Sequence, residues 1–360
     1  MNCKKLDSSR LKAEALRLGF TRMGLAPAEP VAPAFMAHYE EWLRKGWQGD
    51  MHYLENHLTL RSDPRLLLPG AQTVVSLAMS YNPGEGDTQK GIAWYAQGRD
   101  YHEVIRERLT LLTAHLSGEV TIPPLQGRLG GVTIPPLQGR SGGVTIPPLQ
   151  GRLGGVTIPS PTGGGQEGAL WRLCVDTAPI MEKYWAWRCG LGWIGRNTQL
   201  VIPNEGSAFF LAEILTTMQA DHYDTPLFPT PYHAGCKDCR RCLDACPTGA
   251  LSDEGIDARR CLSYLTIEHR GELPQEAAPH LHTHFYGCDC CLRSCPHLSH
   301  KATTVAEFQP SPQLLGMTRE DWVTLTPEQY RQLFRGSAVK RAKYEGLMRN
   351  IKAGQNTKEQ

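Results

Sequence analysis

Hydrophobic residues recur with two different periods in the first third of the chain. Ile105, Leu109, Leu112 and Leu116 are spaced four, three and four residues apart, which predicts an amphipathic helix. Residues 73–81 instead form a run of apolar and β-branched residues, which predicts a buried strand.

Similar patterns extend this alternation over residues 1–225. Helices are expected over residues 8–18, capped by Ser8 or Ser9, over residues 33–45, and from Pro179 in a first turn to about Arg188. Further strands are expected over residues 21–26, 198–202 and 207–215. We therefore expect a mixed α/β domain.

Residues 118–166 interrupt the pattern with a 12-residue repeat. The unit V-T-I-P-P-L-Q-G-R begins at Val120, Val132 and Val144, and a decayed copy begins at Val156. Prolines at this density exclude a helix or a central strand. We expect a disordered or loosely extended surface insertion, and a proline-rich ligand for a partner is the alternative.

The last segment, residues 301–360, is expected to be a short helical tail. Thr326, Pro327 and Gln329 form a capping-box pattern, Gly336 marks a helix end, and a second helix is expected over residues 338–350. The tail is rich in basic residues, which form either a solvated face or a contact to phosphates. These residues are Arg331, Arg335, Lys340, Arg341, Lys343 and Arg349.

Charge and hydropathy narrow the class of protein. The chain has 360 residues, and its 38 Lys and Arg balance 36 Asp and Glu to a net charge of +2. This balance excludes a polybasic nucleic-acid coat but leaves a local basic patch open. The mean hydropathy is −0.36, and the apolar runs are far shorter than the roughly 18 residues of a membrane span. Because the first residues show no apolar signal region, we expect a cytoplasmic protein with no membrane contact.

Most of the twelve cysteines lie between Cys236 and Cys295, in the module over residues 226–300. The run Cys236-x2-Cys239-x2-Cys242-x3-Cys246-Pro247 has the spacing of bacterial ferredoxins, in which the fourth cysteine binds a second cluster. Structural zinc sites are the alternative, but they usually pair C-x2-C units without a following proline.

A second run, Cys288-x2-Cys291-x3-Cys295-Pro296, lacks its first cysteine, and Cys261 can replace it. We therefore predict two [4Fe–4S] clusters. One is expected to be held by Cys236, Cys239, Cys242 and Cys295, and the other by Cys246, Cys261, Cys288 and Cys291. Cys290 is out of register, although a one-residue slip would exchange it with Cys291.

Three further patterns are candidates for sites. Gly190-x-Gly192-x-x-Gly195 follows a predicted helix, which is the wrong context for a dinucleotide fingerprint, so we expect a closely packed turn. The alternating histidines 280, 282 and 284 are expected to be an exposed polar stretch rather than a metal site. Asp176 follows a predicted strand, where a lone acid is either a helix cap or a catalytic group.

Several separate segments resemble the epoxyqueuosine reductase family. They are Val175-Asp176-Thr177-Ala178-Pro179 with Gly190-Leu191-Gly192-Trp193-Ile194-Gly195-Arg196-Asn197-Thr198, Tyr95-Ala96-x-Gly98-Arg99-Asp100-Tyr101-His102, the ferredoxin run with Pro247-Thr248-Gly249-Ala250-Leu251, Tyr286-Gly287-Cys288-Asp289, and Gly336-Ser337-Ala338 with Arg349-Asn350. The repeat insertion and the three alternating histidines depart from the family.

The resemblance implies an α+β fold in which a cobalamin-binding domain precedes a ferredoxin-like module and a short helical tail. It implies an oxidoreductase that reduces epoxyqueuosine to queuosine at the wobble position of tRNA, using cobalamin and two [4Fe–4S] clusters. Its partners would be tRNA carrying epoxyqueuosine and a low-potential electron donor, and we expect a monomer.

The resemblance also implies roles for individual residues. Asp176 would be the proton donor, and burial beside an apolar corrin would raise its pKa. The implied contacts to cobalamin are Arg61, Tyr101, His102, Asp176, Ser263, Cys288 and Asp289.

Two other functions remain open at this stage. A corrinoid reductive dehalogenase of a small molecule would share the cofactors, but the absent export signal and the basic tail argue against it. A ferredoxin-type electron-transfer protein would not need the long region before the cysteines.

Overall fold

The centre of the computed structural model is a five-stranded sheet. The model describes residues 5–86, 88–116, 155–159 and 170–355. The strands lie in the order β1-β2-β8-β5-β4, and all neighbours are antiparallel. Their bounds are β1 Arg22–Pro27, β2 Thr73–Ser80, β4 Gly155–Pro159, β5 Leu170–Cys174 and β8 Phe209–Thr216.

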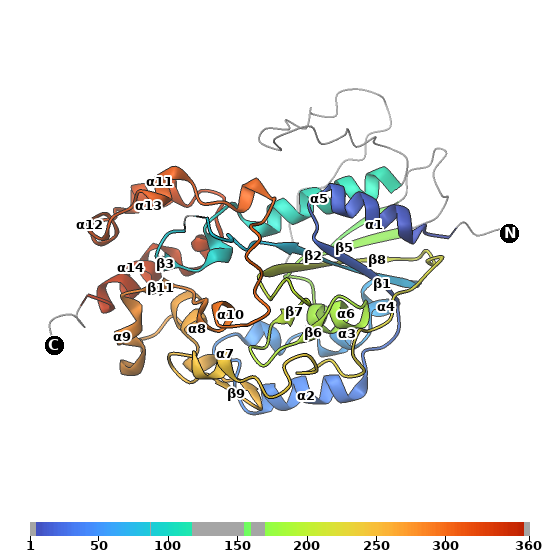
Figure 1. The fold of residues 1–360 in the computed structure, drawn as a ribbon, viewed down its shortest axis with the longest axis horizontal. Helices are drawn as coiled ribbons and strands as arrows, with labels where there is room; N and C mark the ends of the chain where they lie inside the picture. Colours follow the sequence, from blue (N-terminus) through green and yellow to red (C-terminus); the bar gives the residue numbers. More distant parts are fainter. Residues whose placement is uncertain (1–4, 87, 117–154, 160–169, 356–360) are drawn as a thin grey trace, which may run out of the picture.

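Helices cover both faces of this sheet (Figure 1). On one face lie α1 (Ser8–Arg17) and α5 (Tyr101–Leu116), and on the other lie α2 (Pro33–Arg44) and α6 (Glu182–Arg188) with the short α3 (Leu58–Ser62) and α4 (Pro64–Leu67). The interior strand β2 is therefore buried on both faces, which explains its mostly apolar sequence.

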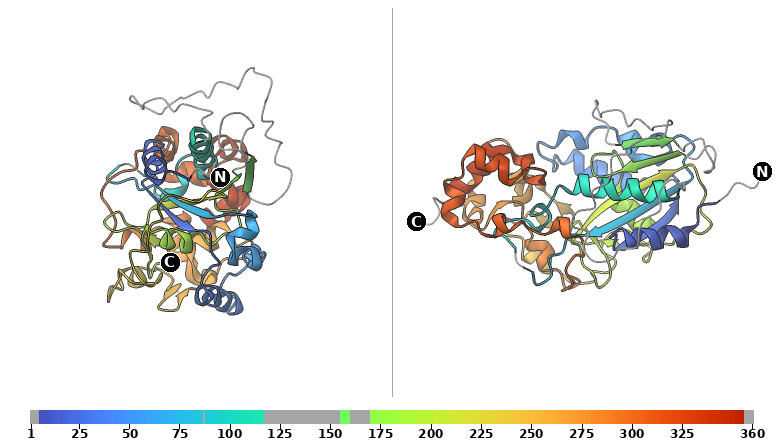
Figure 2. Two further views of the ribbon diagram at one scale, coloured as in Figure 1. Left: turned by 90° about the vertical axis from the view of Figure 1, so that its right-hand side faces the viewer. Right: turned by 90° about the horizontal axis from the view of Figure 1, so that it is seen from above.

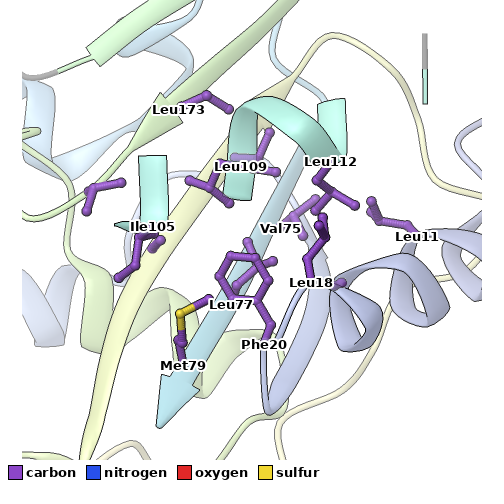
Figure 3. Close-up of a cluster of buried hydrophobic side chains, with 14 of the residues drawn as sticks. Leu11, Leu18, Phe20, Val75, Leu77, Met79, Ile105, Leu109, Leu112 and Leu173 are labelled. Carbon is purple, nitrogen blue, oxygen red and sulfur yellow. The ribbon is translucent and has the colours of Figure 1, made fainter. Parts of the chain in front are cut away.

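The face under α1 and α5 contains one of two cores packed on the sheet. Leu109 and Leu112 of α5 meet Leu11 of α1 and Val75 and Leu77 of β2, and all five are fully buried (Figure 3). The expected i, i+4, i+7 stripe of α5 is thus confirmed as its buried face. The core on the opposite face lies between the sheet and α2, α4 and α6.

Two predicted helix starts differ from the structure. The side chain of Asp7, not Ser8 or Ser9, caps α1 by accepting the N–H of Arg10. The helix expected from Pro179 begins only at Glu182 and has no side-chain cap. The reason is a turn after β5, in which Ile180 N donates to Ala178 O and delays the first helical turn.

Of the repeat segment, the structure describes only Gly155–Pro159, and the rest lies outside the described residues. These five residues form β4, antiparallel to β5, with Gly155 opposite Cys174 and Pro159 opposite Leu170. They are therefore a strand rather than disordered. A proline at the end of an edge strand is compatible with this position.

The C-terminal helices gather at the end of the molecule opposite α1 (Figure 2). They are α11 Pro312–Leu315, α12 Arg319–Val323, α13 Pro327–Leu333, η6 Ala338–Ala342 and α14 Lys343–Ala353, preceded by η5 Ala306–Phe308. The capping box of Thr326 and Gln329 is confirmed. These helices share a core with β3 (Gly91–Ile92) and β11 (His284–Tyr286), which pair in parallel.

The cysteine-rich module is built from short elements between the sheet domain and the tail. They are α7 Arg241–Asp244, β9 Leu251–Ser252, β10 Gly255–Ile256, η3 Ala258–Arg260, α8 Leu262–Ile267, η4 Gln275–Ala277, α9 Ala278–Leu281 and α10 Cys290–Arg293. The remaining elements of the described chain are η1 His52–Leu54, η2 Trp94–Ala96, β6 Trp193–Ile194 and β7 Leu200–Val201. No helix among the described residues combines the length and apolarity needed to cross a bilayer.

Candidate functional site

Asp176 lies in a tight turn between β5 and α6. The backbone N–H of Thr177 donates to Val175 O at 2.6 Å, and Asp176 adopts a φ of +54°. Its own N–H donates to Oε1 of Glu182, in the first turn of α6, at 2.8 Å. The turn between β5 and α6 directs the Asp176 side chain away from the core. This side chain is 51% exposed.

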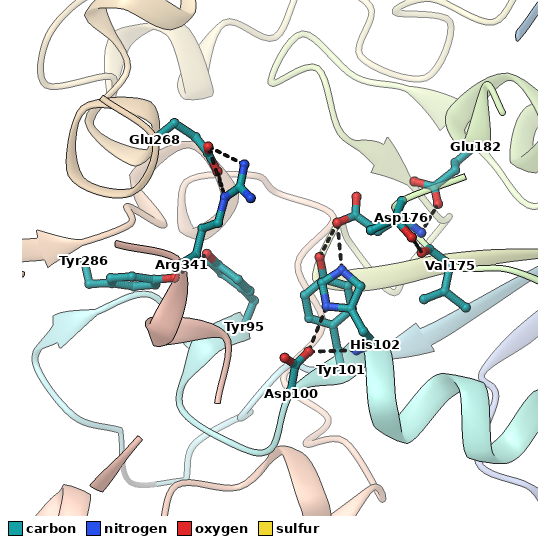
Figure 4. Close-up of polar contacts among 11 residues, drawn as sticks. Tyr95, Asp100, Tyr101, His102, Val175, Asp176, Glu182, Glu268, Tyr286 and Arg341 are labelled. Carbon is teal, nitrogen blue, oxygen red and sulfur yellow. Dashed lines mark hydrogen bonds and ion pairs between the residues drawn. The ribbon is translucent and has the colours of Figure 1, made fainter. Parts of the chain in front are cut away.

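The carboxylate of Asp176 meets two side chains from the first turn of α5. Its Oδ2 accepts hydrogen bonds from the hydroxyl of Tyr101 at 2.8 Å and from Nε2 of His102 at 2.9 Å (Figure 4). On the other side of its ring, Nδ1 of His102 lies 2.8 Å from Oδ1 of Asp100. The imidazole is therefore held between two carboxylates.

This arrangement places the shared proton on the imidazole. Burial alone would lower the pKa of His102, but hydrogen bonds to Asp100 and Asp176 raise it to about 9. Burial alone would raise the pKa of Asp176, but the hydrogen bond and charge of His102 lower it below its ordinary value. The rise in the pKa of Asp176 expected from burial beside a corrin stays a prediction, and in this arrangement the hydrogen bond and charge of His102 oppose it.

Arg341 lies across the site from His102 (Figure 4). Its guanidinium makes a bidentate ion pair with Glu268 through Nε and Nη2, and it stands 5.7 Å from the ring centroid of Tyr53. The charge of Arg341 also contributes to lowering the pKa of Asp176. No sequence pattern singles out Arg341 beyond its place among the basic residues of the tail.

The four cysteines predicted to hold the first cluster lie together. They line one pocket, which also includes Arg196, Asn197, Val201, Pro296 and His297; the cysteines are Cys236, Cys239, Cys242 and Cys295. The indole N–H of Trp193 donates to Sγ of Cys236 at 3.4 Å. Four thiols around one pocket are a suitable donor set for a [4Fe–4S] cluster.

The second set is grouped around Cys291. Burial raises the pKa of this thiol, and the neighbouring Cys261 and Cys246 add to the rise, so the three lie close together. The backbone N–H of Ala250 donates to Sγ of Cys246 at 3.2 Å. The pKa of the fourth member, Cys288, is raised first by a hydrogen bond with Cys290 and by burial, and Cys291 adds to the rise. Three of the predicted ligands therefore lie close together, while Cys288 contacts Cys290 as well.

Cys290 has different neighbours. Its Sγ lies 3.3 Å from Nε2 of His284, and these two atoms lie within 4.8 Å of Sγ of Cys288. His284 is half-buried and does not share a strand with His280, which belongs to α9. The alternating histidines are therefore not the simple exposed stretch that we expected, because β11 starts only at His284.

Arg61, one implied contact to cobalamin, lies in α3, where its Nε donates to Asn56 O at 3.3 Å. Burial raises the pKa of Tyr39 while the charge of Arg61 opposes the rise, so these two are neighbours. Burial raises the pKa of Tyr53 to about 12, the charges of Glu268 and Asp176 add to the rise, and that of Arg341 opposes it. The guanidinium of Arg61 is a hydrogen-bond donor of the kind that amide oxygens at the edge of a corrin would accept.

The remaining implied contacts lie together in the cysteine-rich module. The hydroxyl of Ser263 donates to Cys288 O at 3.5 Å, and Oδ2 of Asp289 accepts the N–H of Trp94 at 2.8 Å. Tyr101 and His102 are committed to Asp176 instead, through the hydrogen bonds described above. The sequence analysis therefore named Tyr101, His102 and Asp176, but it did not predict the hydrogen bonds that join them.

The glycine motif forms the closely packed turn that its context predicted. Gly190 has a φ of +77°, and a Cβ atom there would lie 2.6 Å from Thr225 O. At Gly192 a Cβ would collide with Val201 O. These glycines fit the backbone against neighbouring segments after α6.

Known families match both halves of this chain. Residues 61–129 match a family model described as epoxyqueuosine reductase QueG, DUF1730, and residues 235–297 match the 4Fe-4S double cluster binding domain. An epoxyqueuosine reductase of Cellulophaga algicola is 36% identical over 358 residues, covering 98% of this chain and 99% of the relative. That of Pseudomonas aeruginosa is 33% identical and covers 94% of this chain and 81% of its own length.

Solved structures of the same name share the fold. The epoxyqueuosine reductase of Streptococcus thermophilus has a TM-score of 0.74 at 23% identity, covering 98% of this chain and 81% of that one. Another, determined with an epoxyqueuosine-modified tRNA-Tyr stem loop, has a TM-score of 0.72 at 23% identity, covering 96% and 80%.

Proposed function

The chain belongs to the epoxyqueuosine reductase family of oxidoreductases, and from this premise we propose that it removes the epoxide oxygen of epoxyqueuosine in tRNA. The observation that carries this proposal is the half-exposed carboxylate of Asp176, which accepts hydrogen bonds from Tyr101 and His102. An acid beside a charged imidazole is suited to deliver protons to an oxygen that must leave.

Two [4Fe–4S] clusters would be bound by the thiols that the structure groups together. The first set lines one pocket, and the second set surrounds Cys291. Cobalamin would be held over the open face by Arg61, Ser263, Cys288 and Asp289. When bound, the clusters supply single electrons and cobalamin supplies a reduced cobalt nucleophile.

Reduction of the epoxide requires a fixed number of protons and electrons. Conversion of an epoxide to an alkene breaks two carbon–oxygen bonds and consumes two electrons and two protons, and the oxygen leaves as water. Asp176 touches the open face, whereas His102 lies behind it and carries a proton at neutral pH. We assign the donation of each proton to Asp176 and the storage of a proton to His102, which recharges Asp176 through Oδ2.

Tyr101 and Asp100 would keep this pair in place. The hydroxyl of Tyr101 donates to the same oxygen of Asp176 that meets His102, and its ring stacks on Phe210 with centroids 4.3 Å apart. Asp100 accepts from Nδ1 of His102 and stabilises the charged ring. Both residues act on orientation and charge rather than on the substrate directly.

The test is reduction of modified tRNA by the reconstituted enzyme. tRNA carrying epoxyqueuosine would be incubated anaerobically with the full chain, iron–sulfur clusters, cobalamin and a low-potential reductant, and its nucleosides measured by mass spectrometry. We expect queuosine to replace epoxyqueuosine. Unchanged epoxyqueuosine, with clusters and cobalamin both shown to be bound, would exclude this function.

A further inference from the structure

Glu182 is joined to the turn that carries Asp176 but faces away from the open surface. It occupies the first position of α6, and its Oε1 accepts the backbone N–H of Asp176 at 2.8 Å (Figure 4). The side chain of Asp176 makes its own contacts on the opposite side, to Tyr101 and His102. Asp176 is therefore held by its backbone from one side and by its carboxylate from the other.

The backbone of Asp176 needs such a hold. Its φ of +54° lies in the left-handed region, which costs free energy for a residue with a Cβ atom and persists only where neighbouring contacts fix it. The adjacent bond from Thr177 N to Val175 O closes a very tight turn. Without the Glu182 carboxyl as acceptor, the turn would lose the hydrogen bond of the Asp176 N–H, at the residue with the strained backbone.

The surroundings of Glu182 suit a neutral acceptor. Burial raises its pKa to about 8, and the charge of Asp176 adds to the rise, while the hydrogen bond from the N–H of Asp176 and the charges of Lys183 and His102 oppose it. Lys183 donates its Nζ to Thr198 O at 2.7 Å rather than to Glu182. From β8, the buried Glu213 also faces Glu182, and burial raises its pKa well above the ordinary value. A neutral Glu182 can bind the N–H without placing a second negative charge beside Asp176.

We propose that Glu182 is a positioning residue for the reduction, which holds the turn of Asp176 so that its carboxylate meets Tyr101, His102 and the substrate. This inference rests on the proposed role of Asp176. A role as an ordinary helix cap does not account for the contact, because Glu182 binds the N–H of a residue six positions earlier in the chain, outside α6.

The test compares Glu182→Ala with Glu182→Gln in the reconstituted enzyme. Alanine removes the acceptor, and we expect kcat to fall roughly 10- to 100-fold with little change in KM, since misplacement of a catalytic group by about 1 Å has effects of this size. Glutamine keeps a carbonyl oxygen, so Glu182→Gln should retain at least about a third of the wild-type kcat. Glu29→Ala is the matched control, because Glu29 pairs with Arg188 at the other end of α6 and is exposed.

Two further measurements separate positioning from a general loss of structure. In an Asp176→Ala background, Glu182→Ala should cause no additional loss of kcat, since it acts through Asp176. Hydrogen exchange of peptides covering residues 173–181 should become faster in Glu182→Ala and remain unchanged in Glu182→Gln, and this readout does not require activity. If Glu182→Ala does not fold, Glu182→Met fills a similar volume without an acceptor and replaces it.

The outcomes distinguish this inference from the proposed function. If the wild-type enzyme reduces modified tRNA and Glu182→Ala matches it in kcat and hydrogen exchange, the positioning role is overturned. A Glu182→Gln variant as impaired as Glu182→Ala would overturn it as well. If the wild-type enzyme is inactive, the proposed function fails, while hydrogen exchange still decides whether Glu182 holds the turn.

Discussion

Nε2 of His102 lies 2.9 Å from Oδ2 of Asp176, although the two residues are 74 positions apart in the chain. The pair combines an imidazole with a pKa raised to about 9 and a carboxyl whose pKa is lowered. At neutral pH the proton therefore resides on His102. Of the two side chains, that of Asp176 is the more exposed, so it can contact a substrate while His102 holds the next proton.

Replacing Asp176 should abolish turnover without disturbing the cofactor sites. We expect Asp176→Asn to lower kcat by roughly 10²- to 10⁴-fold, the usual contribution of a positioned acid. The amide cannot deliver a proton, but it preserves the volume and can still contact Tyr101. Turnover of modified tRNA, iron content and bound cobalamin would be measured together.

Asp321→Asn is the matched control for this variant, because Asp321 is an exposed capping residue of α12 in the C-terminal tail. It should retain wild-type turnover. An Asp176→Asn enzyme as active as this control would remove Asp176 from the reaction.

The pair should also make stability depend on pH. The pKa of His102 is raised in the folded state, so its contribution is complete below the unfolded value of about 6.5 and is lost as pH rises through about 9. We expect the wild-type protein to lose about 1–3 kcal/mol between pH 7 and 9.5 that a His102→Gln variant does not lose. Activity should decline over the same interval, as His102 loses its proton.

Chemical unfolding at several pH values would measure this difference. His222→Gln provides a control, because His222 lies in the exposed segment after β8. Parallel pH profiles of stability for wild type and His102→Gln would show that the imidazole is not held in its charged form by the two carboxylates.

Replacing a predicted cluster ligand should lower the iron content, whereas replacing Cys290 should not. Cys236→Ser removes a ligand of the pocket that the first set lines, and we expect the iron content to fall from about eight to about four per chain. Cys290→Ser should keep the full content, since Cys290 is out of register with both ligand runs and its Sγ lies 3.3 Å from Nε2 of His284. Iron and acid-labile sulfide assays after anaerobic reconstitution would measure both. Equal loss in the two variants would contradict the assignment.

The sequence predicted local groupings better than distant ones. The spacing of Cys236, Cys239 and Cys242 requires them to lie on one tight loop, and the structure places them around one pocket. The contact between His102 and Asp176 depends instead on how α5 and β5 pack against each other across the intervening repeat, which no local pattern encodes. The start of α6 was misplaced for a similar reason, because Pro179 satisfies the rules for a first turn while the turn of Asp176 delays the helix.

The basic tail shows the same limit. Arg349 belongs to the cluster of basic residues that suggests a phosphate contact. Its guanidinium instead donates to three backbone carbonyls, those of His269, Gly271 and Leu265. Burial lowers the pKa of Arg349 below its ordinary value, as expected for a side chain that makes an internal structural contact. A list of basic residues cannot separate such a side chain from one that remains available to a ligand.

Arg331 and Arg335 are two exposed basic residues of the tail that we expect to contact tRNA. Both are exposed on or just after α13, where they line a surface hollow with Glu328 and Gln332. Replacing both with alanine should weaken tRNA binding and reduce the slope of log affinity against log salt by about one per lost phosphate contact. The kcat at saturating tRNA should remain unchanged, because neither residue contacts Asp176.

Glu328→Gln is the opposing control. Glu328 pairs with Arg331 at 2.6 Å, so the substitution frees that guanidinium and should strengthen tRNA binding. Titrations of tRNA at several salt concentrations would measure both effects, and identical salt slopes in the wild type and the double variant would place the tRNA on another surface.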